Sequence, residues 1–182
     1  METEHDSRLT NRARTGDKEA WATLYRAAYP DLLAYCTRRT GNLDEAKEIV
    51  SETFMQAVNS FESFKGVDDG FRPWVFGIAK NVLARHFRQS MRFSHMRNED
   101  EEIDWREPID GILESDTNAS LLVAFDRLTK TEKEIMEFRF VGQLSSEQIA
   151  RILETTPSAI RMAQKRALEK LRTWMREAEH VS

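Results

Sequence analysis

Apolar residues recur at intervals of three and four along most of this chain, the spacing typical of amphipathic helices. One stripe runs over residues 17–40 and passes Pro30, where we expect the helix to be kinked or restarted. Two more stripes run over residues 43–57 and 71–92, with turn-forming residues between them. The seven glycines and four prolines leave few turns. The sequence therefore predicts an all-α protein.

Residues 116–176 divide into four short predicted helices. Capping boxes begin the second helix at Thr129 and the third at Ser145, because each hydroxyl residue is followed three positions later by Glu or Gln. Thr156 and Pro157 provide the cap and the first turn of the fourth helix. The last two helices fit the helix-turn-helix arrangement, in which the second helix lies in the major groove of DNA.

The details of this helix pair suggest where it would contact DNA. The small Ala150 stands where the two helices would cross closely. Glu154 occupies a turn position that usually holds glycine in a left-handed conformation, which costs a non-glycine residue about 1–2 kcal/mol. We therefore expect a differently built turn, and an ordinary helical hairpin with a solvated basic face is the alternative. The candidate base and phosphate contacts are Ser158, Arg161, Met162, Gln164, Lys165 and Arg166.

Charge is distributed unevenly along the chain. The 31 acidic and 27 basic residues give a net charge of −4, but residues 1–92 and 121–182 sum to +1 and +2, while residues 93–120 sum to −7. The acidic segment has little apolar periodicity, which is typical of a flexible linker. We expect two small helical domains, with a tail at residues 1–16, a domain at 17–92, an acidic linker at 93–115, a helix-turn-helix domain at 116–176 and a tail at 177–182.

Basic residues gather on two of the predicted helices. The helix over residues 71–92 carries five basic residues and no acid, and the helix over residues 157–176 carries six basic residues against one acid. Such clusters neutralise phosphates locally in a protein that is acidic overall. The sequence therefore favours a nucleic-acid-binding function.

Five aromatic residues lie between positions 61 and 76, beside the first basic helix. Aromatic rings next to basic side chains form a surface for single-stranded nucleic acid, because the rings stack on unpaired bases. The alternative is that these rings belong to the core. Trp74 fits the inward stripe and favours the core, whereas Phe64 and Phe71 flank a glycine-containing loop and leave both interpretations open.

The remaining composition limits the classes of function. Cys36 is the only cysteine, which fits a reducing, cytoplasmic compartment, and its apolar surroundings indicate a buried structural thiol. The chain shows no signal peptide and no apolar run long enough to cross a membrane, so we expect no membrane insertion. The histidines are scattered and no nucleotide-binding or hydrolase motif is present, so we expect neither catalysis nor a metal or cofactor.

Three blocks follow one another along the chain. Residues 46–57 read AKEIVSETFMQA, residues 71–88 read FRPWVFGIAKNVLARHFR, and residues 128–172 contain the helix-turn-helix pair. In these blocks the chain resembles the bacterial σ70 family of RNA polymerase sigma factors, specifically the small extracytoplasmic-function (ECF) group. The blocks are similar, in order, to the helix that docks on the polymerase, the segment that recognises and melts the −10 element, and the helix-turn-helix that reads the −35 element.

The resemblance implies a promoter-specificity subunit that binds core RNA polymerase and directs transcription initiation. It implies contacts with the β′ clamp helices from Glu48, Ile49, Glu52, Thr53 and Gln56. It implies contacts with −10 DNA from Phe64, Lys65, Phe71, Arg72, Lys80, Asn81, Arg85 and Arg88. The six candidate residues of the helix-turn-helix would read the −35 element, and that domain would also contact the β flap. The family further implies an anti-sigma factor as a partner.

A free-standing helix-turn-helix repressor or activator is the alternative function. Such regulators usually dimerise and read two half-sites about one helical turn apart. The sequence shows neither a heptad seam nor a spare helix for a dimer. We therefore expect a monomer when the protein is free, and we favour the sigma-factor interpretation.

Overall fold

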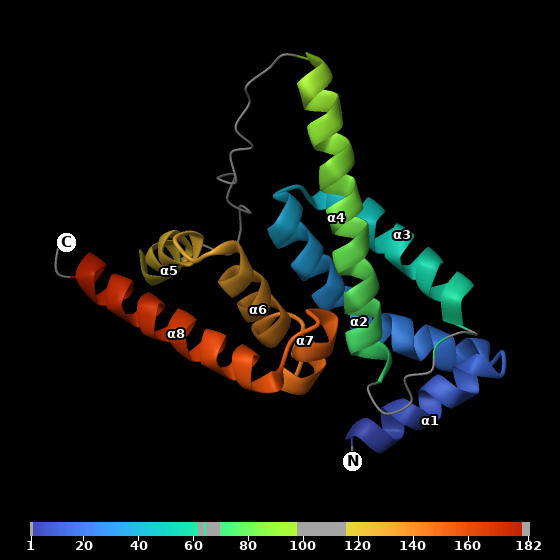
Figure 1. The fold of residues 1–182 in the computed structure, drawn as a ribbon. Coiled ribbons are helices and arrows are strands. Elements are labelled where there is room, and N and C mark those ends of the chain that lie inside the picture. Colours follow the sequence, from blue (N-terminus) through green and yellow to red (C-terminus); the bar gives the residue numbers. More distant parts are fainter. Residues whose placement is uncertain (1, 62–63, 65–69, 98–115, 180–182) are drawn as a thin grey trace. The chain divides into compact units, whose positions relative to one another are not determined.

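The structure, a computed structural model, describes residues 2–61, 64, 70–97 and 116–179. Every regular element within these ranges is a helix, which confirms the all-α prediction (Figure 1). The chain divides into two compact units, Met1–Glu107 and Pro108–Ser182. Residues 98–115, which make up most of the predicted acidic linker, lie outside the described ranges.

The described part of unit 1 is built from α1 Glu2–Arg14, α2 Lys18–Thr40, α3 Leu43–Ser60 and α4 Phe71–Arg97. Helices α2, α3 and α4 pack against one another. Their shared core includes the fully buried side chains of Leu32, Tyr35, Val50, Phe76 and Leu83. Helix α4 extends five residues beyond the end predicted at residue 92, so the first residues of the predicted linker are helical.

Helix α1 occupies most of residues 1–16, the segment predicted from the sequence as an N-terminal tail. The helix packs on α2, and it buries Thr10 and Ala13. Leu9 and Ala13 are its only apolar residues. That is too little apolar periodicity for a sequence pattern to indicate a helix.

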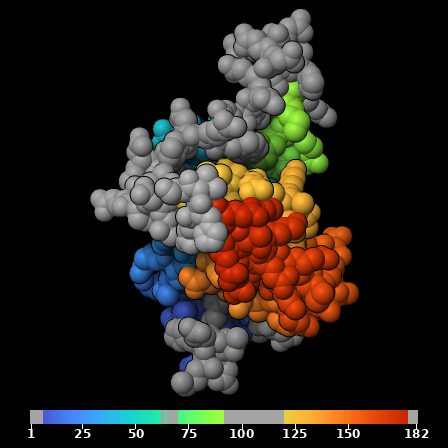
Figure 2. Space-filling model, turned by 90° about the vertical axis from the view of Figure 1, so that its left-hand side faces the viewer, coloured from blue at the N-terminus to red at the C-terminus, as the bar shows by residue number. Residues whose placement is uncertain are grey.

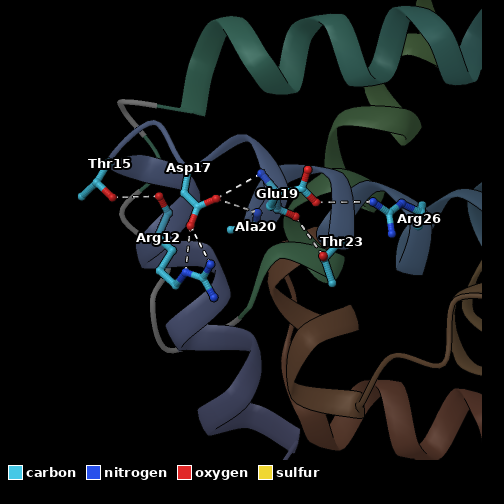
Figure 3. A network of polar contacts seen from close by, with 7 residues as sticks. All are labelled: Arg12, Thr15, Asp17, Glu19, Ala20, Thr23 and Arg26. Atoms are coloured by element: carbon cyan, nitrogen blue, oxygen red, sulfur yellow. Dashed lines mark hydrogen bonds and ion pairs between the residues drawn. The ribbon is translucent and has the colours of Figure 1, made fainter.

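A polar network joins α1 to the start of α2 (Figure 3). The carboxylate of Asp17 caps α2 by accepting hydrogen bonds from the amides of Glu19 and Ala20, at 3.0 and 3.1 Å. It also forms an ion pair with Arg12, at 2.7 Å. These hydrogen bonds, from the amide of Ala20 first and then from Arg12, lower the pKa of Asp17. The junction is therefore fixed by one carboxylate that serves two helices.

Helix α2 continues through Pro30 to Thr40 as one helix, so of the kink or restart expected from the sequence, the restart does not occur. Proline removes one hydrogen bond from the helix interior. At this place the side chain of Arg72, from α4, donates to the carbonyl of Ala27 at 3.4 Å and forms an ion pair with Asp31. A contact from α4 thus supports α2 around the proline.

The described part of unit 2 contains α5 Asp116–Asp126, α6 Lys130–Phe140, α7 Ser146–Ile152 and α8 Pro157–Glu179. These are the four short helices predicted from the sequence, and both predicted capping boxes are formed. One core cluster joins α5 and α6 to α8 through the buried side chains of Ala124, Leu128, Met136, Ala167 and Leu171.

The turn between α7 and α8 adopts the left-handed conformation at Glu154, with φ of 52°, so the expectation of a differently built turn is wrong. The amide of Thr155 donates to the carbonyl of Ala150 at 2.9 Å, and the amide of Glu154 donates to that of Arg151 at 3.4 Å. This pair of bonds is the Schellman arrangement, which satisfies the last carbonyls of a helix. The hydrogen bonds offset the strain of a non-glycine residue at this position.

Candidate functional site

The outer face of α8 brings together most of the residues predicted to contact DNA. Ile160, Ala163 and Ala167 are buried on the inner face, which turns the intervening positions outward. Figure 2 shows the later part of α8, in red, at the surface of the molecule. The exposed set consists of Ser158, Arg161, Met162, Lys165 and Arg166.

Gln164 does not belong to this exposed set. Its side-chain oxygen lies 3.4 Å from the hydroxyl of Ser146 on α7, and its side-chain nitrogen is buried without a hydrogen-bond partner. Gln164 follows Ile160 by one turn and Ala163 by one residue, so it stands at the edge of the buried stripe. Gln164 is half-buried, and its contact with DNA stays a prediction.

Arg161 is held by a residue that the sequence did not single out. Its Nη1 lies 2.9 Å from Oε1 of Glu147 on α7, and both side chains are 57% exposed. Hydrogen bonds from the backbone amide of Glu147 itself and from the side chain of Ser145, together with the nearby Arg161, lower the pKa of Glu147. The two residues are 14 positions apart, so no local pattern could have indicated this contact.

A second ion pair holds α8 against α6. Lys170 Nζ lies 2.8 and 3.0 Å from the two carboxylate oxygens of Glu132, which is also the acidic member of the capping box begun by Thr129. Burial raises the pKa of Glu132, but the hydrogen bonds from Lys170 and Thr129 outweigh it, and the pKa is lowered overall. This contact fixes the position of α8 in unit 2.

The predicted polymerase-binding residues of α3 fall on two different faces. Glu48 is exposed, and Glu52 and Gln56 are half-buried. Ile49 and Thr53 are buried in the core, where the Thr53 hydroxyl donates to the carbonyl of Ile49 at 2.7 Å. The prediction that Ile49 and Thr53 contact a partner is therefore wrong, because they share the inward stripe of α3.

Apolar side chains that the sequence did not single out lie on the exposed side of α3. Met55 is 62% exposed and Val58 is 54% exposed. Met55 follows Glu48 by seven positions and Glu52 by three, which places all three on one face of the helix. This helical spacing is the feature of the sequence from which Met55 could have been assigned to the same face as Glu48 and Glu52. The face therefore combines acidic and apolar side chains.

Two basic residues predicted to bind −10 DNA are engaged within unit 1. Arg72 pairs with Asp31 on α2, and Arg85 pairs with Glu52 on α3. The second pair links a candidate DNA contact to a candidate polymerase contact.

The exposed strip of α4 is narrow over residues 71–87, whereas residues 88–91 are all exposed. Asn81, Ala84 and Arg88 are exposed at intervals of three and four, with the half-buried Lys80 beside them. Of the basic residues predicted to bind −10 DNA, Arg88 is therefore the most accessible in the described part of α4.

The aromatic rings predicted to stack on bases belong to the core. Phe64 is 5% exposed and Phe71 is 1% exposed, and both pack against the half-buried Trp74, with ring centroids 4.4 and 5.9 Å away. Trp21 from α2 contacts Phe71 edge-on at 5.4 Å. Neither phenylalanine offers a free face to a base, so this prediction is wrong for both. Lys65 lies outside the described residues.

The described ranges can also be compared with what a metal site, a reactive cysteine or a membrane-spanning helix requires. They contain no group of His, Cys, Asp and Glu residues that could hold a metal ion. Burial raises the pKa of Cys36 to about 12, so its thiol stays protonated and unreactive near neutral pH. No helix in these ranges is both long and apolar enough to span a membrane.

Comparison with protein families identifies two regions of the chain. The family description Sigma-70 region 2 matches residues 24–93, and the description Sigma-70, region 4 matches residues 124–173. Together the two matches cover more than half of the chain. The first contains α3 and most of α4, and the second contains α7 and most of α8.

Individual relatives extend these matches. The chain is 34% identical over 167 residues to the ECF RNA polymerase sigma factor BldN of Streptomyces coelicolor, covering 90% of this chain and 63% of the relative. It is 28% identical to the RNA polymerase sigma factor YlaC of Bacillus subtilis, covering 87% of this chain and 95% of the relative. The chain thus spans less than two thirds of the length of BldN and nearly all of YlaC.

The fold is similar to that of a solved structure, the sigma factor RpoE of Bartonella quintana in complex with the anti-sigma factor NepR. The TM-score is 0.67 at 20% identity, covering 86% of this chain and 96% of that one. At this identity the similarity concerns the fold alone.

Proposed function

Because the chain belongs to the σ70 family of RNA polymerase sigma factors, in its ECF group, we propose that it binds core RNA polymerase and directs initiation at specific promoters. Unit 1 would bind the polymerase and the −10 element, and unit 2 would read the −35 element. We propose that the two domains span residues 17–92 and 116–176, the boundaries predicted from the sequence. The role requires no catalytic group from this chain.

The exposed face of α8 is the observation that carries this proposal. A helix in this position lies in the major groove, where its N-terminal residues meet base edges. Ser158, Arg161 and Met162 occupy the first two turns of α8, and Lys165 and Arg166 follow toward its middle. In unit 1, the exposed part of α4 around Arg88 would bind the −10 DNA backbone.

The exposed face of α3 would bind the β′ clamp helices of the polymerase. Glu48 and Glu52 provide negative charge, and Met55 provides exposed apolar surface about one turn after Glu52. Apolar anchors surrounded by polar residues are typical of protein interfaces. This face replaces the predicted set that included Ile49 and Thr53. We further propose contact between unit 2 and the β flap.

An anti-sigma factor is proposed as a further partner, because the fold is similar to that of a sigma factor solved in complex with one. The proposed activity takes place where the polymerase works, in the cytoplasm. When free of partners, the chain is proposed to be a monomer.

Transcription in vitro tests this function. Bacterial core RNA polymerase would be incubated with fragmented genomic DNA, with and without the protein, and new RNA start sites would be mapped. We expect new starts that share two spaced upstream sequence elements. No new starts, combined with tight duplex binding by the protein alone, would instead indicate a free-standing helix-turn-helix regulator.

A further inference from the structure

We propose that Glu147 is a positioning residue that determines specificity, because it orients Arg161 toward one base pair of the upstream promoter element. The inference rests on the proposed function and deepens it at the α7–α8 surface. It concerns how one exposed guanidinium is aimed, and it depends on a contact between two helices of unit 2.

Glu147 lies at the start of α7. It is the second residue of the helix, two positions after the cap Ser145, and hydrogen bonds from its own backbone amide and from the side chain of Ser145 lower its pKa. Ser145 is fixed in turn, because its hydroxyl accepts from the amide of Gln148 at 3.2 Å and its amide donates to the side chain of Gln148 at 2.8 Å. Arg161 therefore meets a preorganised acceptor.

Arg161 has further hydrogen-bond donors that this contact does not use. A guanidinium carries five N–H donors in a fixed plane, and the contact with Glu147 is made through Nη1 alone. Arg161 lies in the second turn of α8, which begins at Pro157. A guanidinium held on one side loses less side-chain freedom when it binds, and its free donors match the O6 and N7 acceptors of guanine.

The negative charge of Glu147 repels DNA phosphates, so Glu147 does not act by attracting DNA. A carboxylate on a surface that faces phosphates reduces affinity for every sequence alike. Glu147 therefore contributes to selectivity rather than to total affinity. Without its carboxylate, Arg161 would remain cationic but would be free to contact phosphates in place of a base edge.

The experiment uses the full chain bound to core polymerase. A promoter is first mapped with the wild-type protein, and each base pair of its upstream element is then changed to the other three. We expect the wild type to discriminate by about 10-fold or more at the base pair read by Arg161. Glu147→Gln should abolish most of that preference at this one position and leave the preferences elsewhere unchanged.

Further variants show whether Glu147 acts through Arg161. Arg161→Ala should remove the same preference, and adding Glu147→Gln to it should cause no further change. Glu169→Gln is the matched control, because Glu169 is an exposed acid 3.9 Å from the exposed Lys165 on the same helix; its preferences should equal those of the wild type. Glu147→Asp keeps the charge but shortens the side chain, so it should also break the ion pair with Arg161. It replaces Glu147→Gln in the experiment if that variant does not fold.

Wild-type preference at every position in Glu147→Gln would overturn the proposal. An equal effect of Glu147→Gln in the presence and absence of Arg161 would overturn it as well. Both results presuppose an active wild-type protein, so they differ from failure of the proposed function, in which the wild type itself produces no promoter-dependent starts.

Discussion

The two units expose their candidate binding surfaces in different ways. In unit 2, α8 contacts its neighbours along one stripe, and the rest of its circumference is open. In unit 1, α4 packs against α2 and α3 and also contacts α1, so only Asn81 and Ala84 are exposed over residues 71–87, whereas residues 88–91 are all exposed. The packed part of α4, residues 71–87, thus presents few side chains, whereas α8 presents an exposed face along most of its length.

This difference also decides which charges are available. On α4, Arg72 and Arg85 pair with acids of neighbouring helices. On α8, Arg166 stays exposed, and Arg161 is held by an ion pair that is itself well exposed. Two of the basic residues predicted to bind −10 DNA therefore hold the helices of unit 1 together, whereas the basic residues at the start of α8 stay exposed.

The largest expected effect separates a buried ring from an exposed one. Phe71→Ala should lower the free energy of unfolding by about 3–5 kcal/mol, because it leaves a cavity in unit 1. Phe140→Ala, at a side chain 61% exposed in unit 2, should change it by no more than about 0.5 kcal/mol. Urea unfolding followed by tryptophan fluorescence measures both. Full stability in Phe71→Ala would show that the ring is not a core residue.

A smaller effect is expected at the ion pair between α6 and α8. Glu132→Gln should cost about 1–3 kcal/mol, because it removes a nearly buried acceptor of charge-assisted hydrogen bonds. Glu169→Gln, at an exposed pair, should cost close to nothing. Thermal unfolding at neutral pH compares the two variants. Equal melting temperatures for both would contradict the proposed role of Glu132.

The pH dependence gives a second measurement of the same contact. The pKa of Glu132 is lowered in the folded state from its ordinary value of 4.5, so its contribution to stability is present above that value and is lost as the pH falls through the folded-state pKa. Unit 2 should therefore lose stability below about pH 4.5, and Glu132→Gln should lose less. A parallel decline in both proteins would assign the acid sensitivity to other groups.

The smallest effect concerns the turn before α8. Glu154→Gly should stabilise unit 2 by about 0.5–1 kcal/mol, since relief of left-handed strain outweighs the added flexibility of the unfolded chain. Gly41, which already has a left-handed conformation after α2, provides the reverse control. Gly41→Ala should destabilise unit 1 by a similar amount. Destabilisation by Glu154→Gly would mean that the Glu154 side chain makes a contact of its own.

Much of the helical pattern was predictable because its signals are local. Capping boxes at Thr129 and Ser145 placed α6 and α7, and the amphipathic stripe of α8 separated buried from exposed residues. Helix α1 was missed because its residues are nearly all polar. Local patterns therefore located those helices that have clear apolar stripes or caps.

The residues of the candidate site were less predictable where tertiary contacts decide. Phe64 and Phe71 flank a loop in sequence, yet Trp21 and Trp74 enclose them in the core. Glu147 reaches Arg161 across two helices. Neither arrangement leaves a periodic signal. Packing between helices, which the sequence does not display, determined the outcome in both cases.

A crossed comparison of Glu48→Lys and Lys165→Gln tests the central claim, the division of labour between α3 and α8, most directly. Affinity for core polymerase and transcription from one mapped promoter would be measured for each. We expect Glu48→Lys to weaken polymerase binding about 10-fold or more and to recover transcription at excess polymerase. Lys165→Gln should bind polymerase normally but transcribe several-fold less at saturation. Loss of polymerase affinity in Lys165→Gln alone would contradict this account.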